Sequence, residues 1–409
     1  MSTPTTPVPE APFTIGAPEF AADPLSHYAW LREHAPLART RLEYGPVSQP
    51  IWVLSRYRDC RAMLTDPRLP RSPVGGSAMT AGLPEHLRLL STESLIMKDE
   101  PEHKRLRTLV SKPFTPKMTA KLGERVRELA VERLDALADH DVVDLRQDFA
   151  LPIPYTVIAD MVGVGETDRS RFRSGVTALL SDRGAEDWDT QVRDLVAFTR
   201  DLVARKHADP GDDILTGLIH AEEDGDRLSE DEIVSMVFTL VVAGYETTYN
   251  LITNAVVTLL DHPEQRDRLQ QAPDDDALWR SAIEEIVRYA GPVGGTKPAT
   301  AAEDIDWDGR TIPAGASVLP LLGSANRDPE AFDAPDRFDI TRSPNHHLGF
   351  GYGPHFCLGA NLARLEARIA VQVLLTRRPR LSLAVPRDEL TLETMPLWTR
   401  YDELPVRLG

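Results

Sequence analysis

The sequence predicts a mainly α-helical fold with minor β structure, and two observations carry that prediction. Apolar residues spaced three and four apart, in segments that Pro and Gly separate, fill most of residues 101–221, and a long apolar segment follows at 229–260. Beyond residue 290 the pattern changes to short strand-like pieces and turns, such as 309–322, before one more helix near the C-terminus. Because no break in composition interrupts the 409 residues, we expect one large domain.

The composition argues against several classes of protein. A formal net charge of −17 disfavours a nucleic-acid-binding protein and gives no attraction to anionic membranes. Only two cysteines occur, too few for a disulfide framework, which is typical of a reducing compartment. No basic residue precedes Arg32 and no apolar run occurs there, so we expect neither a signal peptide nor a membrane anchor. These features predict a soluble, cytoplasmic protein.

The N-terminal region is expected to begin with an extended, partly mobile arm. Residues 1–20 are rich in Pro, Thr and Ala, and ordered structure is expected from Asp23, with 21–409 as a single domain. The elements expected next are a helix at 24–36, a strand at 50–57, a helix at 57–69 and a long loop at 71–83, followed by helices at 101–113, 116–138, 153–162, 167–181, 188–207 and 211–221. We expect Cys60 to be a small buried hydrophobic residue.

The long apolar segment is predicted to be a buried central helix. Ser229 and Glu232 have the spacing of a capping box, so the helix should begin at Ser229 and run to about residue 260, roughly 45 Å at 1.5 Å per residue. Glu246 and Asn250 interrupt the apolar run and leave a stretch too short for a bilayer. A helix that is apolar on nearly all faces is instead expected to form the axis of the core.

Within this helix the sequence AGYETT is unusual for a core. Gly244 weakens a helix but lets a ligand or a bent backbone approach. The spacing of Ala243, Glu246 and Thr247 places a small residue, an acid and an alcohol on one face, where they could border one cavity. The alternative, equally open at this point, is a solvated Glu246 and a Thr247 that bonds its own helix backbone.

A glycine-rich stretch, GFGYGPHFCLGA at 349–360, contains the second cysteine. Its glycines allow a bulky planar group to approach the backbone, and Cys357 directly precedes a helix. A helix N-terminus favours a negative sulfur, so we expect a lowered pKa of the Cys357 thiol and a good soft metal ligand. The nearby His346, His347 and His355 raise the alternative of a zinc site, but paired ligand spacings such as C-x-x-C are missing.

With these motifs in hand, the chain resembles the bacterial-type, soluble cytochromes P450, which are haem-thiolate monooxygenases. The family pattern F-x-x-G-x-x-x-C-x-G is matched by Phe350, Gly353, Cys357 and Gly359, and the similarity extends from about residue 20 to the C-terminus. The resemblance implies a cytochrome P450-like catalytic domain over 21–409, with the long helix crossing a buried haem b whose iron Cys357 binds. The residues expected to bind haem are His103, Arg107, Ala243, Gly244, Lys297, Phe350, Gly351, His355, Cys357 and Gly359.

The haem propionates have a distinct expected set of partners. His103, Arg107 and His355 resemble the family's cationic donors to these carboxylates. The chain departs from the family pattern where an arginine usually follows the E-x-x-R helix, because Lys297 is the nearest cation there. We expect Lys297 to replace that arginine imperfectly, since lysine is a point charge and not a planar fork.

Two further resemblances concern the scaffold and the chemistry. Glu285 and Arg288 match the E-x-x-R pair and are expected to form a buried structural unit that Arg337 completes. Glu246 and Thr247 match the family's acid and alcohol, and are expected to be catalytic by ordering a water relay that delivers protons to dioxygen.

The resemblance also implies a substrate region and electron donors. The substrate-facing parts are expected to be 71–90, 170–190, Leu240, Ala243, Thr247, 293–296, Met395, Leu397 and Trp398. Val74, Met79, Leu179 and Leu180 would make this region apolar, and Gly294 and Gly295 would leave room beside the haem. Electrons are expected from a separate ferredoxin and its NAD(P)H-dependent reductase, docked on a basic patch of Arg105, Lys112, Arg364 and Arg368.

The predicted function is therefore insertion of one oxygen atom from dioxygen into a mainly apolar small organic molecule, by hydroxylation or epoxidation, in secondary metabolism. Three alternatives stay open. The same haem site could carry out oxidative coupling or desaturation, or a peroxide-driven oxidation that Glu246 and Thr247 disfavour. A haem sensor or carrier without oxidation is the alternative from a different class, since function depends on the site and not on the fold.

Overall fold

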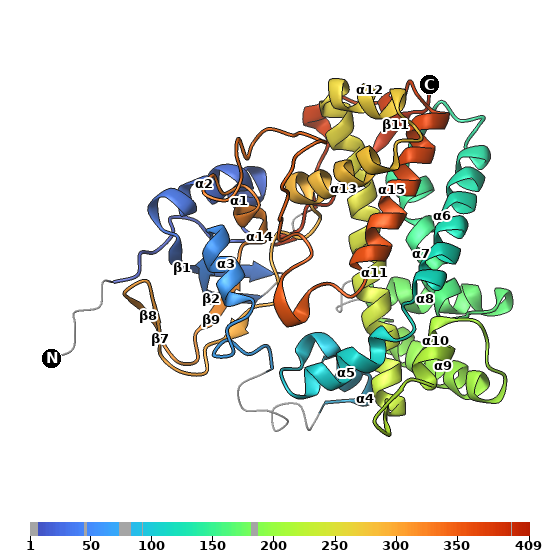
Figure 1. Ribbon diagram of the computed structural model, residues 1–409, viewed down its shortest axis with the longest axis horizontal. Coiled ribbons are helices and arrows are strands. Elements are labelled where there is room, and N and C mark those ends of the chain that lie inside the picture. The colour runs from blue at the N-terminus through green and yellow to red at the C-terminus, as the bar shows by residue number, and fades with distance from the viewer. Residues whose placement is uncertain (1–6, 45–46, 73–82, 92, 181–186, 394) are drawn as a thin grey trace.

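The structure is a computed structural model that describes residues 7–44, 47–72, 83–91, 93–180, 187–393 and 395–409. Figure 1 shows a helical part that surrounds α11 (Glu230–Asp261), and a smaller part that holds the main sheet, near the N-terminus. The other α-helices are α1 (Pro18–Ala22), α2 (Pro24–His34), α3 (Tyr57–Met63), α4 (Glu85–Ser91), α5 (Glu102–Ser111), α6 (Pro116–Ala136), α7 (Pro152–Met161), α8 (Arg169–Leu180), α9 (Trp188–Ala208), α10 (Ile214–Ile219), α12 (Pro263–Gln271), α13 (Asp276–Ala290), α14 (Leu322–Ala325) and α15 (Ala360–Arg377).

The strands are short apart from the first pair. They are β1 (Leu37–Tyr44), β2 (Val47–Leu54), β3 (Val142–Asp144), β4 (Glu222–Glu223), β5 (Asp226–Arg227), β6 (Ala299–Thr300), β7 (Ile305–Trp307), β8 (Arg310–Ile312), β9 (Ser317–Pro320), β10 (Ser382–Leu383) and β11 (Pro405–Arg407). The shorter helical turns are η2 (Leu95–Met97), η3 (Arg146–Ala150), η4 (Glu166–Asp168), η5 (Gly353–His355) and η6 (Arg387–Glu389).

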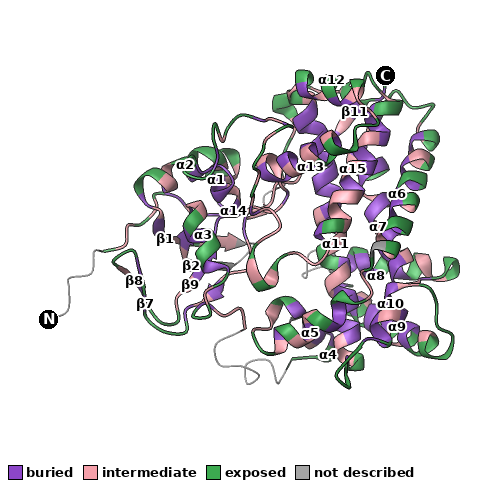
Figure 2. Cartoon of the chain, in the orientation of Figure 1, coloured by how far each residue is buried: buried purple, intermediate pink, exposed green. Residues whose placement is uncertain are grey.

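The central helix α11 begins where the sequence predicted. The Ser229 hydroxyl accepts a hydrogen bond from the Glu232 N–H (3.2 Å), and the Glu232 carboxylate accepts one from the Ser229 N–H (2.7 Å), which completes the capping box. The helix contacts α7, α9, α13 and α15, and Figure 2 shows it buried along most of its length. The prediction of a buried central axis is confirmed.

The main sheet has the strand order β1-β2-β9-β6. Strands β1 and β2 are antiparallel, with Leu37 opposite Leu54, while β2 and β9 run parallel. The smaller sheets are β10-β11-β3, β4-β5 and β7-β8. The parallel β2–β9 pair joins segments more than 260 residues apart, and it holds the N-terminal region against the chain that precedes Cys357.

Most predicted elements are present, with two differences at the N-terminus. The helices predicted between 101 and 221 are all observed, but the predicted strand at 50–57 is β2, which starts at Val47 and ends at Leu54, and its partner β1 was not predicted. The expectation that order begins at Asp23 is wrong, because Ile15 and Phe20 are buried and backbone hydrogen bonds join the arm to β1. The prediction rested on the Pro-rich composition of this segment and did not take account of its alternating apolar residues.

Two smaller observations bear on the predicted compartment and core. Cys60 is fully buried, as predicted, and burial raises the pKa of its thiol. Among the helices in the described ranges, none is long and apolar enough to cross a membrane.

Candidate active site

The loop that carries Cys357 is shaped by glycine and by its own backbone. Gly351 and Gly353 have φ angles of +74° and +73°, which side chains rarely adopt, and a Cβ on Gly353 would lie 2.6 Å from Thr65 Cγ2. The Cys357 N–H donates to the Phe350 carbonyl (2.9 Å) and closes the loop. A Cβ on Gly359 would meet no atom within 4 Å, so this side of the loop is open to a flat ligand.

The electrostatic environment of the sulfur differs from the prediction. Burial raises the pKa of the Cys357 thiol, and the Gly359 N–H, Arg107 and Arg364 oppose this only in part. The predicted lowering is therefore wrong for the protein without its metal, because α15 begins three residues beyond the sulfur and low-dielectric burial outweighs the helix terminus. A bound metal ion deprotonates a coordinating thiol outright, so the site still fits a metal ligand.

Cationic and imidazole side chains predicted to bind haem meet beside this loop. The rings of His103 on α5 and His355 lie 4.0 Å apart between centroids. Arg107 lies one helical turn after His103, close enough to Cys357 for the sulfur to raise the pKa of its guanidinium. His103 is 2 % exposed, and neither of its ring nitrogens has a hydrogen-bond partner among the described residues. Such buried, unpaired donors indicate that an acceptor belongs here.

The two imidazoles are neutral in this environment. Burial lowers the pKa of His355 to about 3, assisted by the charges of Arg71 and His103, and burial together with Arg107 lowers the pKa of His103. The expectation of positively charged histidine donors is corrected on this point: in the protein alone both rings can donate only as neutral N–H groups.

Lys297 reaches the same cluster, where it contacts Arg71, a residue that the sequence did not single out. Its ammonium donates to the Arg71 carbonyl (3.3 Å) and contacts the sulfur of Met97. Burial and the charge of Arg71 lower the pKa of Lys297. Arg71 lay at the start of a predicted loop without periodicity, so only the fold could bring it next to Lys297.

In the middle of α11 the exposed part is small and apolar. Val242 is 40 % exposed and Ala243 is also exposed, although the rest of the helix is mostly buried. The Thr247 hydroxyl donates to the Ala243 carbonyl, which is the local bond considered as an alternative above. A Cβ on Gly244 would lie 3.2 Å from Ile158 Cδ1, so Gly244 allows α7 to pack closely.

Glu246 is placed differently from Ala243 and Thr247. It is 8 % exposed, and its carboxylate is ion-paired with Arg400, which also pairs with Glu393. Arg146 holds the other oxygen of Glu393 (3.0 Å). The expectation that Glu246 shares one open face with Ala243 and Thr247 is thus corrected, because the Arg400 ion pair draws its side chain into the protein. The solvated alternative is also wrong.

The E-x-x-R pair forms a buried unit, with one correction. Both side chains of Glu285 and Arg288 are fully buried, and two hydrogen bonds of 2.8 Å join them. Arg342 completes the unit by donating from Nε to both Glu285 oxygens at 3.1 Å. Arg337, the predicted third member, is 70 % exposed and contributes only its carbonyl, which Arg288 binds.

The predicted substrate segments are only partly described. Val74 and Met79 lie outside the described residues, as do the side chains of Leu179 and Leu180. The space expected beside Gly295 is filled, because a Cβ there would lie 2.6 Å from Leu397 Cδ1, so the expectation of room beside this glycine is wrong. Gly295 allows close packing against the C-terminal hairpin, which comprises residues 392–393 and 395–401 and in which Leu392 pairs with Tyr401.

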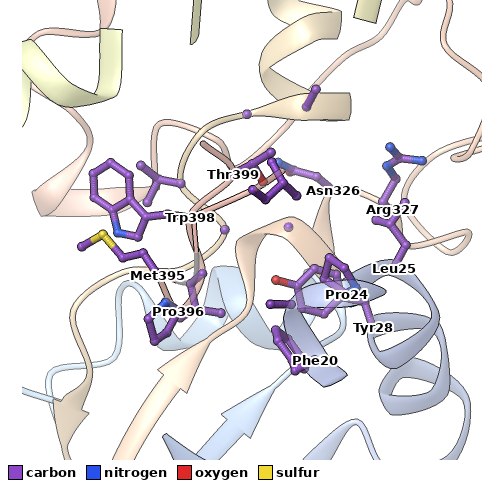
Figure 3. A pocket seen from close by; sticks show the side chains of 18 of the residues that line it. Phe20, Pro24, Leu25, Tyr28, Asn326, Arg327, Met395, Pro396, Trp398 and Thr399 are labelled. Carbon is purple, nitrogen blue, oxygen red and sulfur yellow. The ribbon is translucent and has the colours of Figure 1, made fainter. Parts of the chain in front are cut away.

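That hairpin also borders a separate pocket of about 100 Å³. Figure 3 shows Phe20 and Tyr28 from α1 and α2 on one side and Met395 and Trp398 on the other. None of the described residues that line it is a predicted haem ligand or relay residue. Met395 and Trp398 therefore line this pocket together with residues of the N-terminal helices α1 and α2.

The predicted basic patch is not formed. Each of its four cations is paired with carboxylates: Arg105 with Glu102, Asp226 and Glu232, Lys112 with Glu223, Arg364 with Glu284, and Arg368 with Asp276. Although burial opposes it, hydrogen bonds from His347 and Arg364 lower the pKa of Glu284 to about 2. These charges are neutralised within the protein, which corrects the expectation of a free positive surface.

A metal bound only by clustered protein side chains is not indicated. In the described ranges, no group of three or more His, Cys, Asp or Glu side chains could hold a metal ion. The single sulfur of Cys357 and the unpaired donors around it instead define a site for a prosthetic group that supplies its own metal ligands, the arrangement of a haem-thiolate protein.

Comparison with known proteins agrees with this class. The family model for cytochrome P450 matches residues 183–378. The chain is 41 % identical over 401 residues to cytochrome P450 107B1 of Saccharopolyspora erythraea, covering 95 % of this chain and 96 % of the relative. It is 39 % identical over 383 residues to mycinamicin IV hydroxylase/epoxidase of Micromonospora griseorubida, covering 93 % and 94 %.

A solved structure shows the same fold. The cytochrome P450 PksS of the Bacillus subtilis 168 bacillaene polyketide synthase superposes with a TM-score of 0.88 at 35 % identity, covering 97 % of this chain and 100 % of that one. The chain belongs to the cytochrome P450 family. It is a monooxygenase with haem b as its cofactor, and the predicted cytochrome P450 fold is confirmed.

Proposed function

We propose that this cytochrome P450 hydroxylates or epoxidises a mainly apolar secondary metabolite in the cytoplasm, within a single catalytic domain over 21–409. Electrons come from a separate ferredoxin and its NAD(P)H-dependent reductase. The observation that carries the proposal is the meeting of Cys357 with a cluster of unpaired donors, the buried His103 among them. The low cysteine content supports a reducing compartment.

The residues around the Cys357 loop fit haem b. Cys357 would bind the iron, while Gly359 leaves its side of the loop open to the flat ring system. His103, Arg107, Lys297 and His355 would donate to the two carboxylates. Bound haem would supply the activation of dioxygen, and ligation by the Cys357 thiolate would favour cleavage of the dioxygen O–O bond.

Thr247 is the group on the exposed part of α11 that can move a proton. Its Oγ1 donates to the Ala243 carbonyl and keeps lone pairs that can accept from a water molecule. When the hydroxyl turns away from Ala243, the same oxygen can pass a proton onward. Glu246 would return a proton to Thr247 from the interior of the protein, but only after the Glu246 carboxylate separates from Arg400.

The substrate side of the site is expected to be apolar. Val242 and Ala243 present methyl groups in the middle of α11, and Leu240 is half-buried beside them. Burial of apolar parts of a ligand against such a surface stabilises the complex, while a few polar groups fix the orientation of the ligand. The relatives named for mycinamicin IV and for a polyketide synthase support a medium-sized, largely apolar natural product.

The decisive experiment combines binding with product identification. The purified holoenzyme is titrated with macrolactones, steroids and fatty acids, and a shift of the haem spin state marks a ligand. Each ligand is then incubated with NADPH, a surrogate ferredoxin and its reductase, and the products are identified by mass spectrometry.

Addition of one oxygen atom to a bound ligand would support the proposal. A product two hydrogens lighter, or a coupled dimer, would instead support desaturation or coupling, the second candidate that the haem site permits. Complete lack of turnover, for ligands that do shift the spin state and with verified electron transfer, would favour the sensor and overturn the proposal.

A further inference from the structure

We propose that Arg71 is an additional anchor for the haem carboxylates, and that it supplies the planar guanidinium that the chain lacks at position 297. This inference rests on the placement of the haem carboxylates proposed above. It concerns a residue that the motifs of the family do not mark, and its support comes from hydrogen bonds, burial and charge balance around α5.

The backbone fixes Arg71 next to the start of α5. The N–H groups of Arg71 and Ser72 donate to the two oxygens of Asp99, at 2.9 and 2.8 Å. The Ser72 hydroxyl donates to the Met97 carbonyl at 2.9 Å, and Lys297 donates to the Arg71 carbonyl. These bonds tie the segment that carries Arg71 to the turn that leads into the helix of His103.

The side chain of Arg71 has no protein partner of its own. No hydrogen bond or ion pair joins the guanidinium of Arg71, or that of Arg107, to another described residue. Burial lowers the pKa of both groups, and the charge of Arg71 acts on Lys297, His103 and His355. A half-buried guanidinium without an acceptor is costly unless an anion reaches it.

The charges around the cluster leave a surplus that haem b would balance. Arg71, Arg107 and Lys297 carry three positive charges, whereas Asp99 and Glu100 carry two negative charges, and the Asp99 oxygens already accept backbone N–H groups. The cluster therefore keeps a positive surplus, which the haem carboxylates would offset. Without Arg71 this surplus would disappear.

Geometry favours arginine for this role. A guanidinium can bind both oxygens of one carboxylate through parallel N–H donors, whereas the lysine ammonium acts as a point charge. Lys297 is also turned toward the Arg71 carbonyl and the sulfur of Met97. The chain thus separates two tasks: Arg71 supplies the fork, and Lys297 adds charge and holds the Arg71 backbone.

The test measures retention of haem and not turnover. Holoenzymes carrying Arg71→Ala, Arg71→Lys or Lys297→Arg, and both Arg71 variants combined with Lys297→Arg, are mixed with excess apomyoglobin, and the rate of haem transfer is followed by absorbance. Arg107→Ala and His103→Ala are measured in the same way. Arg68→Ala is the matched control, because Arg68 is three residues away, 43 % exposed and paired with Asp66.

We expect Arg71→Ala to raise the rate of haem loss about tenfold or more, the range for removing a charge-assisted hydrogen bond. Arg71→Lys should lie between it and the parent, and Lys297→Arg should restore much of the loss in the double variant because a fork returns to the cluster. Circular dichroism of each apoprotein separates loss of haem from loss of fold.

Three results would contradict the inference in different ways. If Arg71→Ala matches Arg68→Ala within twofold while Arg107→Ala and His103→Ala speed haem loss, Arg71 does not bind the carboxylates although their placement stands. If none of the variants speeds haem loss, the placement itself is wrong. If Arg71→Ala does not fold, the comparison of Arg71→Lys with and without Lys297→Arg decides: no rescue would contradict the proposal.

Discussion

The guanidinium of Arg400 lies between two carboxylates, with one N–H group on Glu246 and another on Glu393. The Glu393 N–H also donates to the Arg400 carbonyl (3.0 Å), so the two residues form the closed base of the C-terminal hairpin. Glu246 belongs to α11. The ion pair therefore fastens the predicted relay acid to the hairpin that contacts Gly294.

Removing Arg400 should destabilise the protein strongly. Arg400→Ala leaves Glu246 as a buried charge without a partner, and we expect a loss of about 3 kcal/mol in the free energy of unfolding. Arg377→Ala is the matched control: its exposed pair with Asp135 should contribute less than about 1 kcal/mol. Urea denaturation of both holoenzymes measures the difference. Equal losses would show that the Glu246 ion pair is no more than a surface contact.

The role of Thr247 can be tested against a similar threonine on the same helix. Thr247→Val removes the hydroxyl that can pass a proton, and we expect coupling of NADPH to product to fall about tenfold or more, with hydrogen peroxide accumulating, since positioned proton transfer contributes about 10²–10⁴ in rate. Thr239 also bonds a carbonyl four residues earlier, and Thr239→Val should keep normal coupling. Similar peroxide yields in the two variants would exclude a special role for Thr247.

The buried Glu285–Arg288 unit should control folding and not chemistry. Glu285→Ala removes the acceptor of both Arg288 and Arg342, and we expect a loss of about 3–5 kcal/mol, enough to prevent accumulation of folded protein in many hosts. Arg337→Ala should change stability by less than about 0.5 kcal/mol because that side chain is exposed. A large effect of Arg337→Ala would restore the sequence-based expectation that it completes the unit.

Glu366 predicts how stability depends on pH. Burial raises the pKa of this carboxyl on α15 from 4.5 to about 8, and one of its oxygens has no hydrogen-bond partner among the described residues. The folded protein keeps this proton where the unfolded chain has lost it, so the contribution of Glu366 to stability falls as pH rises from about 4.5 to 8, by about 1.4 kcal/mol per unit.

Glu366→Gln removes this titration while keeping a similar shape. The thermal midpoint of the Glu366→Gln holoenzyme should exceed that of the parent at pH 8, and this excess should shrink steadily as the pH falls toward 4.5. The difference between the two proteins is the quantity to compare, since all other groups titrate in both. A difference that does not vary with pH would mean that Glu366 ionises normally.

The sequence predicts well whatever depends on neighbours along the chain. The capping box of Ser229 and Glu232, the helix of Glu285 and Arg288, and the pair of His103 and Arg107 all follow from spacings of three and four residues, and all are observed. Contacts between distant segments escape such rules. Arg400 meets Glu246 across 154 residues, and Arg342 meets Glu285 across 57.

Electrostatic predictions fail for a related reason. The sequence indicates that Cys357 stands near a helix start, but it does not reveal how deeply the sulfur is buried, and burial decides the direction of its pKa shift. Likewise, Arg105 and Lys112 look like free cations until the β4–β5 hairpin brings Asp226 and Glu223 against them. The sequence gives the number of charged residues, but the charge of a surface also depends on which of those residues form ion pairs.

The arm before α1 also affects the tendency of the protein to aggregate. β1 is an edge of the main sheet, and an uncovered edge strand is a template for pairing with other chains. The arm covers it with backbone hydrogen bonds: Ala11 donates to the Arg39 carbonyl, Ile15 to the Arg41 carbonyl, and Glu43 to the Ile15 carbonyl. These residues therefore protect the protein from aggregation through β1. A recombinant form that begins at residue 21 would expose the unpaired backbone groups of this edge strand.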